Sequence, residues 1–354
     1  MATTPLDIHM VVIEWVYQSS QHAAIDYPTL RACALVCRAW TPVAQRLLFR
    51  RVPIPKRQLP TIHSTIVALF VRTLRNAPHL AAHVRSFHFD LVKTKSTVSD
   101  AMEALALCTN VDGITANLYG TDSSFAALIA QLDTLPVRPS FLSVSGRDSF
   151  VDRIMQIWPS IRILDMGAIA ISDMHVRMPR ELQALSTRSS PTRTYGFGPK
   201  TVAPMLRDLE IECHDGMSSL VAAALVSSGV APQLRSLCLL GHGAEVPPPA
   251  VLEELAALES FVLDRLPTEA CGLPKNLRHL GYHFHGIGHE RIEKLHILLD
   301  VARTLPKLNM FTATRQSSQV VLEEIERWCL EGGFEFVVYP EPACFPRPRH
   351  VDWI

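Results

Sequence analysis

Three closely spaced histidines are the first candidates for chemistry in this sequence. His283, His285 and His289 lie in the segment 282–289. Residues two apart on a strand share one face, so imidazoles at 283 and 285 could turn toward one metal ion. However, no carboxylate at a recognised spacing completes a catalytic set, and the exposed positions of an ordinary strand alternate in the same way. We therefore expect neither a metal site nor another cofactor.

The cysteines indicate no chemistry either. The chain has 8 of them, and none forms a Cys-x-x-Cys pair. Their spacing matches neither a zinc site nor a small disulfide scaffold. Cys33 and Cys37 lie four residues apart on one face of a predicted helix, where a buried free cysteine behaves as a small apolar residue. We expect all of these thiols to be reduced.

Nothing in the sequence marks the chain for secretion or for membrane insertion. The N-terminus lacks the basic segment of a signal peptide. The longest apolar runs are far shorter than the roughly 20 residues that cross a bilayer. Together with the reduced thiols, this predicts a soluble protein of the cytoplasm or the nucleus that does not bind membranes.

Composition and motifs argue against catalysis and against nucleic-acid binding. The chain lacks a Walker loop, Gly-x-Gly-x-x-Gly, Gly-x-Ser-x-Gly and His-Glu-x-x-His. Its 34 basic residues balance 34 acidic ones, whereas affinity for a phosphate backbone comes from an excess of basic residues. With 48% hydrophobic residues the chain can bury a substantial core. We predict a folded protein that is not an enzyme.

From residue 84 onward one apolar pattern repeats along the chain. The pattern L-x-x-L-x-L, with other apolar or small residues accepted, recurs about every 25 residues, which is the period of leucine-rich repeats. Its last apolar positions alternate with polar ones, as in a short strand with one buried face. Helical stretches fill the intervals. The units begin at Val84, Val111, Phe141, Ile161, Leu182, Leu206, Leu234, Leu258, Leu277 and Leu308.

A strand and a helix that repeat in this way predict an α/β fold. Stacked units of this kind form a curved solenoid, or horseshoe, whose strands line the concave face. We expect this leucine-rich-repeat solenoid to span residues 80–340. The segment 341–354 is rich in proline and is expected to form a non-helical tail.

The first fifty residues carry the signals of a small unit of three helices. Apolar residues recur at steps of three and four between residues 6 and 17, so they share one helix face. Prolines at first-turn positions mark the second and third helices. A unit of this size has a small core, into which Leu35, Val36 and Trp40 cannot all point. We expect some of these side chains to face a partner.

Taken together, the two parts resemble an F-box protein with leucine-rich repeats, of the kind that has expanded in mushroom-forming fungi. The clearest match is the segment 29–40, TLRACALVCRAW, where the family has a leucine-rich helix that ends in V-C-[KR]-x-W. The opening PLDI at 5–8 is similar to the family's L-P-x-E-I, although Thr4 replaces the first leucine and His9 interrupts the aliphatic run. The resemblance gives an F-box-like domain at 4–52 and a linker with a connecting helix at 53–79.

The resemblance implies a function in protein binding. An F-box docks to the Skp-type adaptor of a cullin-RING ubiquitin ligase, and the repeats hold a protein substrate. Matched onto this sequence, the adaptor surface comprises Pro5, Ile8, Leu35, Val36, Trp40 and Leu48. These six residues could instead pack the helical core. The alternative function is a repeat scaffold outside any ubiquitin ligase, in which the helices serve as a cap.

Substrate binding is expected at the polar positions of the predicted concave strands. Five units carry arginine at the first variable position of the pattern. On strands about 5 Å apart these arginines could hold acidic or phosphorylated side chains through paired hydrogen bonds. Alternatively, neighbouring acidic residues neutralise them on a solvated face. The candidate residues are Arg85, Arg162, Arg207, Glu210, Arg235, Arg278 and His283.

Overall fold

The strands in the described part of the chain form one parallel β-sheet in which each strand follows its predecessor in chain order. This sheet has 12 strands, from β1 at one edge to β12 at the other, and confirms the predicted α/β class. The chain divides into two compact units, Met1–Val144 and Ser145–Trp353. The computed structural model describes residues 11–14, 17, 26–52, 60–92, 95–119, 122–145, 148–169, 178–189, 203–212, 221, 225–241, 246–264, 272–282, 290–314 and 319–339.

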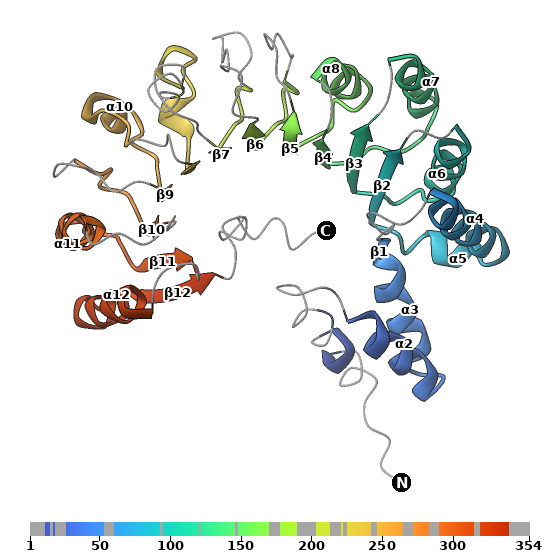
Figure 1. Cartoon of the computed structure of the whole chain (residues 1–354), viewed down its shortest axis with the longest axis horizontal. Coiled ribbons are helices and arrows are strands. Elements are labelled where there is room, and N and C mark those ends of the chain that lie inside the picture. Colours follow the sequence, from blue (N-terminus) through green and yellow to red (C-terminus); the bar gives the residue numbers. More distant parts are fainter. Residues whose placement is uncertain are drawn as a thin grey trace. The chain divides into compact units, whose positions relative to one another are not determined.

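The first unit begins with helices and leads into the sheet. Helical residues at 11–14 and 17 precede α2, and the helices that follow β1 lie on one side of its strands (Figure 1). Its elements are α2 (Tyr27–Val36), α3 (Thr41–Arg50), β1 (Arg51–Val52), α4 (Pro60–Asn76), α5 (Pro78–Ala81), β2 (Ser86–Val92), α6 (Lys95–Leu107), β3 (Gly113–Tyr119), α7 (Asp122–Asp133) and β4 (Phe141–Ser145).

The second unit continues the alternation of strands and helices, and its helices again lie on one side of the strands (Figure 1). Its elements are α8 (Asp148–Ile157), β5 (Ile163–Ile169), β6 (Ala184–Ser189), β7 (Asp208–Glu212), the 3₁₀-helix η1 (Ala231–Gln233), β8 (Ser236–Leu240), α10 (Pro249–Glu254), β9 (Ser260–Leu263), β10 (His279–Tyr282), α11 (Glu290–Arg303), β11 (Met310–Thr314), α12 (Gln319–Gly332) and β12 (Glu335–Tyr339).

The apolar triplet of each repeat forms the core. In the unit at Leu206, all three apolar residues are buried, and the polar residues between them on β7 are half-buried on the other face of the strand. Neighbouring strands keep the same register, so Leu209 lies opposite Leu237 and Ile211 opposite Leu239. The predicted units at Val111 and Leu182 are likewise buried. Burial of stacked apolar side chains on one face is the main source of stability for such a sheet.

The predicted unit at Phe141 is wrong in register. The backbone amides of Ser140 and Phe141 both donate to the carbonyl of Asp112, at 2.8 and 3.0 Å. Ser140 therefore occupies the place that Asp112 has in the preceding unit. The apolar triplet is then Pro139, Leu142 and Val144, all of which are buried. The predicted unit began two residues too late. Pro139 and Phe141 are both apolar, so the pattern alone does not show which of them is the first residue of the unit.

Just before eight of the described strands, β2, β3 and β5–β10, a backbone carbonyl joins successive repeats. The carbonyl of Arg207, for example, accepts hydrogen bonds from the amides of Arg235 and Ser236, at 2.7 and 3.0 Å. This double acceptance extends the ladder by one residue on the amino-terminal side of each strand. The same arrangement occurs at Arg85, Asp112, Arg162, Gln183, Arg235, Glu259 and Arg278.

Within the described residues, no helix combines the length and the apolar character needed to span a lipid bilayer.

Close packing over Gly281 gives a test of the sheet. A Cβ atom at Gly281 would lie 2.8 Å from both Thr312 Oγ1 on β11 and Val262 Cγ2 on β9. Gly281→Ala should therefore lower the free energy of unfolding by about 1–3 kcal/mol, because the neighbouring side chains must shift. Gly272→Ala is the matched control, since a Cβ there meets nothing within 4 Å. Urea unfolding followed by circular dichroism measures both, and equal midpoints would contradict the close approach.

Candidate interaction surfaces

The N-terminal helical residues share one small apolar core. Side chains from the helical residues at 11–14 and 17, from α2 and from α3 contribute to it. Its small size leaves apolar residues of the same stretches outside. The buried members are Ile13, Tyr17, Leu30, Cys33, Val43, Ala44 and Leu47, with Ala34, Trp40 and Leu48 partly buried against them.

Local hydrogen bonds fix both ends of α2. Asp26 caps its amino terminus, where its carboxylate accepts from the Thr29 amide at 3.0 Å and from the Thr29 hydroxyl at 2.6 Å. These hydrogen bonds, that of the hydroxyl first, lower the pKa of Asp26. At the other end, the Thr41 hydroxyl lies 2.8 Å from the carbonyl oxygen of Ala34 and 3.1 Å from that of Cys37. The start of α3 therefore holds the last turn of α2.

This last turn exposes two large apolar side chains. Leu35 is 86% exposed and Val36 is 62% exposed. They follow Leu30 by five and six residues, and at about 100° per residue this places both away from the buried side of the helix. We call Leu35 and Val36 the α2 patch. Cys37, which was predicted to share the buried face with Cys33, is exposed instead, because α2 ends before it.

The structure divides the predicted adaptor residues into three groups. Leu35 and Val36 lie on the surface, whereas Trp40 and Leu48 are partly buried against the helical core and belong to both surface and core. Pro5 and Ile8 lie outside the described residues.

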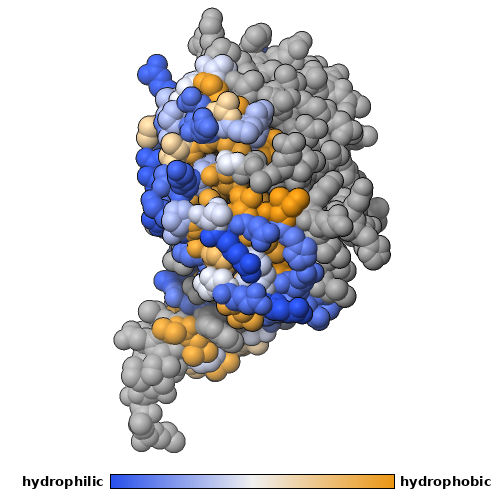
Figure 2. All heavy atoms as spheres, turned by 90° about the vertical axis from the view of Figure 1, so that its left-hand side faces the viewer, coloured by the Kyte–Doolittle hydropathy of each residue, from blue (hydrophilic) through white to orange (hydrophobic). Residues whose placement is uncertain are grey.

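Two further apolar side chains were not singled out from the sequence. Val11 and Val12, in the helical residues before α2, are 65% and 45% exposed. The sequence did contain a signal for them. Both are apolar, yet they lie beside the predicted apolar helix face, which includes Ile13, and not on it. Apolar surface is visible at the bottom of Figure 2, at the level of the N-terminal helices.

The predicted arginines lie beside the strands rather than on them. Each of the five immediately precedes a strand, and its carbonyl accepts the paired backbone hydrogen bonds described above. All five side chains are exposed. They occupy one register position at the amino-terminal edge of the sheet, which we call the rim. The expected placement on the strand faces was wrong, because the first variable residue of the pattern belongs to the turn that enters the strand.

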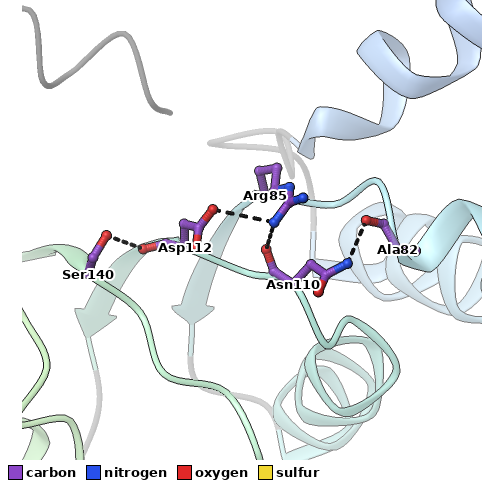
Figure 3. A network of polar contacts seen from close by, with 5 residues as sticks. All are labelled: Ala82, Arg85, Asn110, Asp112 and Ser140. Carbon is purple, nitrogen blue, oxygen red and sulfur yellow. Dashed lines mark hydrogen bonds and ion pairs between the residues drawn. The ribbon is translucent and has the colours of Figure 1, made fainter.

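Two rim arginines form ion pairs with acidic residues of the same chain. Arg85 Nη1 lies 3.6 Å from Asp112 Oδ2 and donates to the carbonyl of Asn110 at 3.3 Å (Figure 3). In the same network, the Asn110 side chain donates to the carbonyl of Ala82 at 3.0 Å. In the second unit, Arg162 Nε lies 3.5 Å from Glu181 Oε2. These exposed pairs contribute little stability, but they neutralise both guanidinium groups.

The other three rim arginines have no such partner in the described part of the chain. Arg207, Arg235 and Arg278 lie within 4.0 Å of no described acidic side chain, unlike Arg85 and Arg162. Besides the five arginines, the predicted substrate residues were Glu210 and His283.

Glu210, on β7, is half-buried and accepts a hydrogen bond from the Ser186 hydroxyl on β6 at 3.2 Å. It therefore lies on the sheet face and not on the rim. His283 lies outside the described residues.

The sheet face opposite the repeat core is also buried over β8–β11. Cys238 and Val262 lie side by side there and form a separate apolar cluster with Leu240. His279 and Thr312 are buried on the same face. Alternation along the strands predicts this set to be wet, and the structure instead gives it interior character.

His279 bridges two hydroxyl groups from neighbouring strands. Its Nδ1 lies 2.7 Å from Ser260 Oγ on β9, and its Nε2 lies 2.8 Å from Thr312 Oγ1 on β11. A neutral imidazole donates from one nitrogen and accepts at the other, so it satisfies both hydroxyls. Burial lowers the pKa of His279 to about 4.

A serine beside a histidine is a nucleophile–base pair only where the imidazole is well oriented and accessible. Here the second partner is a neutral hydroxyl and the ring is buried, so the arrangement is structural.

No potential metal site occurs among the described residues, in which no three His, Cys, Asp or Glu side chains cluster suitably. His283, His285 and His289 lie outside them.

No protein-family model matches the chain, and no curated protein matches it in sequence.

The buried His279 makes the stability of the fold depend on pH. Its folded pKa is about 4 and an unfolded histidine titrates near 6.5, so the unfolded chain binds the proton more strongly between these values. Stability should fall by up to about 3 kcal/mol from this group as the pH drops from 6.5 to 4.

The contribution of His279 can be isolated by subtraction. His279→Gln should flatten the fall in unfolding free energy between pH 6.5 and 4, relative to wild type, while also lowering stability at pH 7. His79→Gln is the control, because this histidine is exposed on α5. Urea unfolding at a series of pH values gives the slopes, and parallel slopes for wild type and His279→Gln would show that this imidazole is not buried as described.

Proposed function

We propose that the chain is a non-catalytic substrate receptor of a cullin-RING ubiquitin ligase. In this proposal the helices at 4–52 form an F-box-like unit that docks to a Skp-type adaptor. The strands and helices that follow form a leucine-rich-repeat solenoid, or horseshoe, that holds a protein target. The α2 patch is the observation that carries the proposal, because it combines the most specific part of the family resemblance with an exposed apolar surface.

The position of the α2 patch supports docking. It lies in the segment 29–40, which resembles the family's leucine-rich helix, and its two side chains are exposed although both are large and apolar. An interface centre is formed by apolar and aromatic side chains with few charges. Trp40, which belongs to the same segment and is partly buried against the helical core, suits such a centre because its ring can both pack in that core and meet a partner.

The sheet supports the second half of the proposal. Consecutive parallel strands, equal register from one unit to the next and a repeated backbone carbonyl are the features expected of stacked repeats. In such arrays each unit contacts its neighbours, and long rows of exposed side chains result. Rows of this kind bind extended protein segments.

The proposed mechanism is proximity. A receptor that holds its target raises the effective concentration of the target's lysines near the ubiquitin carrier that the ligase supplies. The receptor then needs no acid, base or nucleophile. The structural role of the Ser260–His279–Thr312 bridge fits this view.

A second candidate function is a repeat scaffold in which the N-terminal helices only cap the sheet. One observation favours it: α3 runs directly into β1, which pairs with β2, so the helices adjoin the first edge of the sheet. Phe49 of α3 stacks on Phe70 of α4, and Phe70 packs at a tilt against Phe87 of β2, with ring centroids 6.3 and 6.2 Å apart. Terminal units of repeat proteins need a cap of this kind.

Co-purification with the adaptor distinguishes the two functions. We expect the chain, co-expressed with a Skp-type adaptor, to co-purify with it. Leu35→Asp should weaken this binding at least about 10-fold, because a carboxylate would be desolvated at the interface centre. Leu330→Asp is the matched control, since Leu330 is an exposed apolar residue (75%) on α12 of the second unit. Isothermal titration calorimetry on the purified proteins gives the affinities.

Two results would contradict the receptor proposal. One is a folded wild-type chain that shows no affinity for the adaptor. The other is equal affinity of wild type and Leu35→Asp. Either result would favour the scaffold. Circular dichroism of both variants checks that they fold, which is expected because both positions are on the surface.

A further inference from the structure

Two adjacent arginines on the rim of the second unit stand apart from the other charged residues of the rim. Arg207 and Arg235 occupy the same register position on neighbouring strands, because the carbonyl of Arg207 accepts the Arg235 amide at 2.7 Å. Neighbouring strands lie about 4.8 Å apart. Two guanidinium groups are therefore anchored side by side, and both side chains are exposed. We call them the arginine pair.

The charges around the arginine pair do not neutralise it within the described chain. On the rim, Gln183 and Glu259 flank the pair on either side. Asp208, the residue after Arg207, is the first residue of β7. Asp208 and Glu210 lie on the face of the sheet and not on the rim. No ion pair joins either arginine to these acids. By contrast, the Arg162 guanidinium on the same rim is paired with Glu181.

Two adjacent like charges disfavour the folded state unless a counter-charge is present. Two guanidinium groups about one strand spacing apart match a phosphate dianion, whose three oxygens can accept hydrogen bonds from both. A single carboxylate has two oxygens and one charge, so it would satisfy the pair less well. A phosphorylated side chain is therefore the best complement.

We propose that the arginine pair binds a phosphorylated side chain in an extended segment of a partner protein. This inference rests on the proposed function, since the segment would belong to the receptor's substrate. The rest of the rim distinguishes a phosphorylated protein from a nucleic acid. A polyanion needs a continuous row of basic residues, whereas here neutral Gln183 and acidic Glu259 bound the pair and the net charge of the chain is zero. The site accommodates one local dianion.

Fluorescence anisotropy with three peptide pools tests the proposal on the purified full chain. The pools carry fluorescein, have degenerate flanking residues and differ only in the central residue, which is phosphoserine, glutamate or serine. The phosphoserine pool should bind about 10-fold more tightly than the serine pool, with the glutamate pool between them. Its binding should weaken as salt increases.

Matched double variants assign the binding to the arginine pair. Arg207→Gln together with Arg235→Gln should reduce affinity for the phosphoserine pool about 10-fold. The control is Arg85→Gln together with Arg162→Gln, which removes two rim arginines that are already paired within the chain. This control should change affinity less than about 2-fold.

Three outcomes would overturn the proposal. They are equal affinities for the phosphoserine and serine pools, equal losses in both double variants, and tighter binding of a mixed-sequence single-stranded RNA than of the phosphoserine pool. Adaptor co-purification of the Arg207→Gln, Arg235→Gln variant is expected to match that of wild type. Loss of peptide binding and loss of adaptor binding therefore report separately on this site and on the proposed function.

Discussion

The structure depends on the backbone carbonyls that precede most of the described strands and accept two amide protons from the next repeat. This interaction uses no side chain, so it holds whether the residue is Arg207, Gln183 or Glu259. It sets the register of one strand against the next, and that register stacks the apolar triplets on one face. The residue that supplies the carbonyl lies between two buried apolar positions and is left on the surface. Its identity is therefore unconstrained by packing, and it is available for function.

The spacing of apolar residues was sufficient to predict the α/β class and most strands. The triplet at Leu206, for example, is buried as predicted. The pattern failed where apolar residues are too frequent to fix a register, as at Phe141, where only the backbone bonds to Asp112 show that Ser140 is the equivalent position. It also could not show where a strand begins. The arginines were for this reason assigned to the strand faces, although they lie one residue before the strands.

A second limit of the pattern is that it describes only one face of the sheet. Alternation assigns His279 and Cys238 to the polar face, yet both are buried. Burial at two faces depends on groups distant in sequence, which a local period of two does not report.

The exposed Leu35 and Val36 are the opposite case. There the number of apolar residues exceeds what three short helices can bury, and counting alone indicated that some must stay outside.

The exposure of these residues bears on the choice between a receptor and a capped scaffold. A cap shields the end of the core, and here the half-buried Phe49 of α3 and Phe70 of α4 pack in series onto the buried Phe87 of β2. Leu35, at 86% exposure, takes no part in such shielding. Its burial by a partner would contribute about 25 cal/mol for each Å² removed from water. The capping role therefore accounts for the contacts between these three aromatic rings but leaves the α2 patch without a purpose, whereas docking to an adaptor accounts for the α2 patch and is compatible with the aromatic contacts.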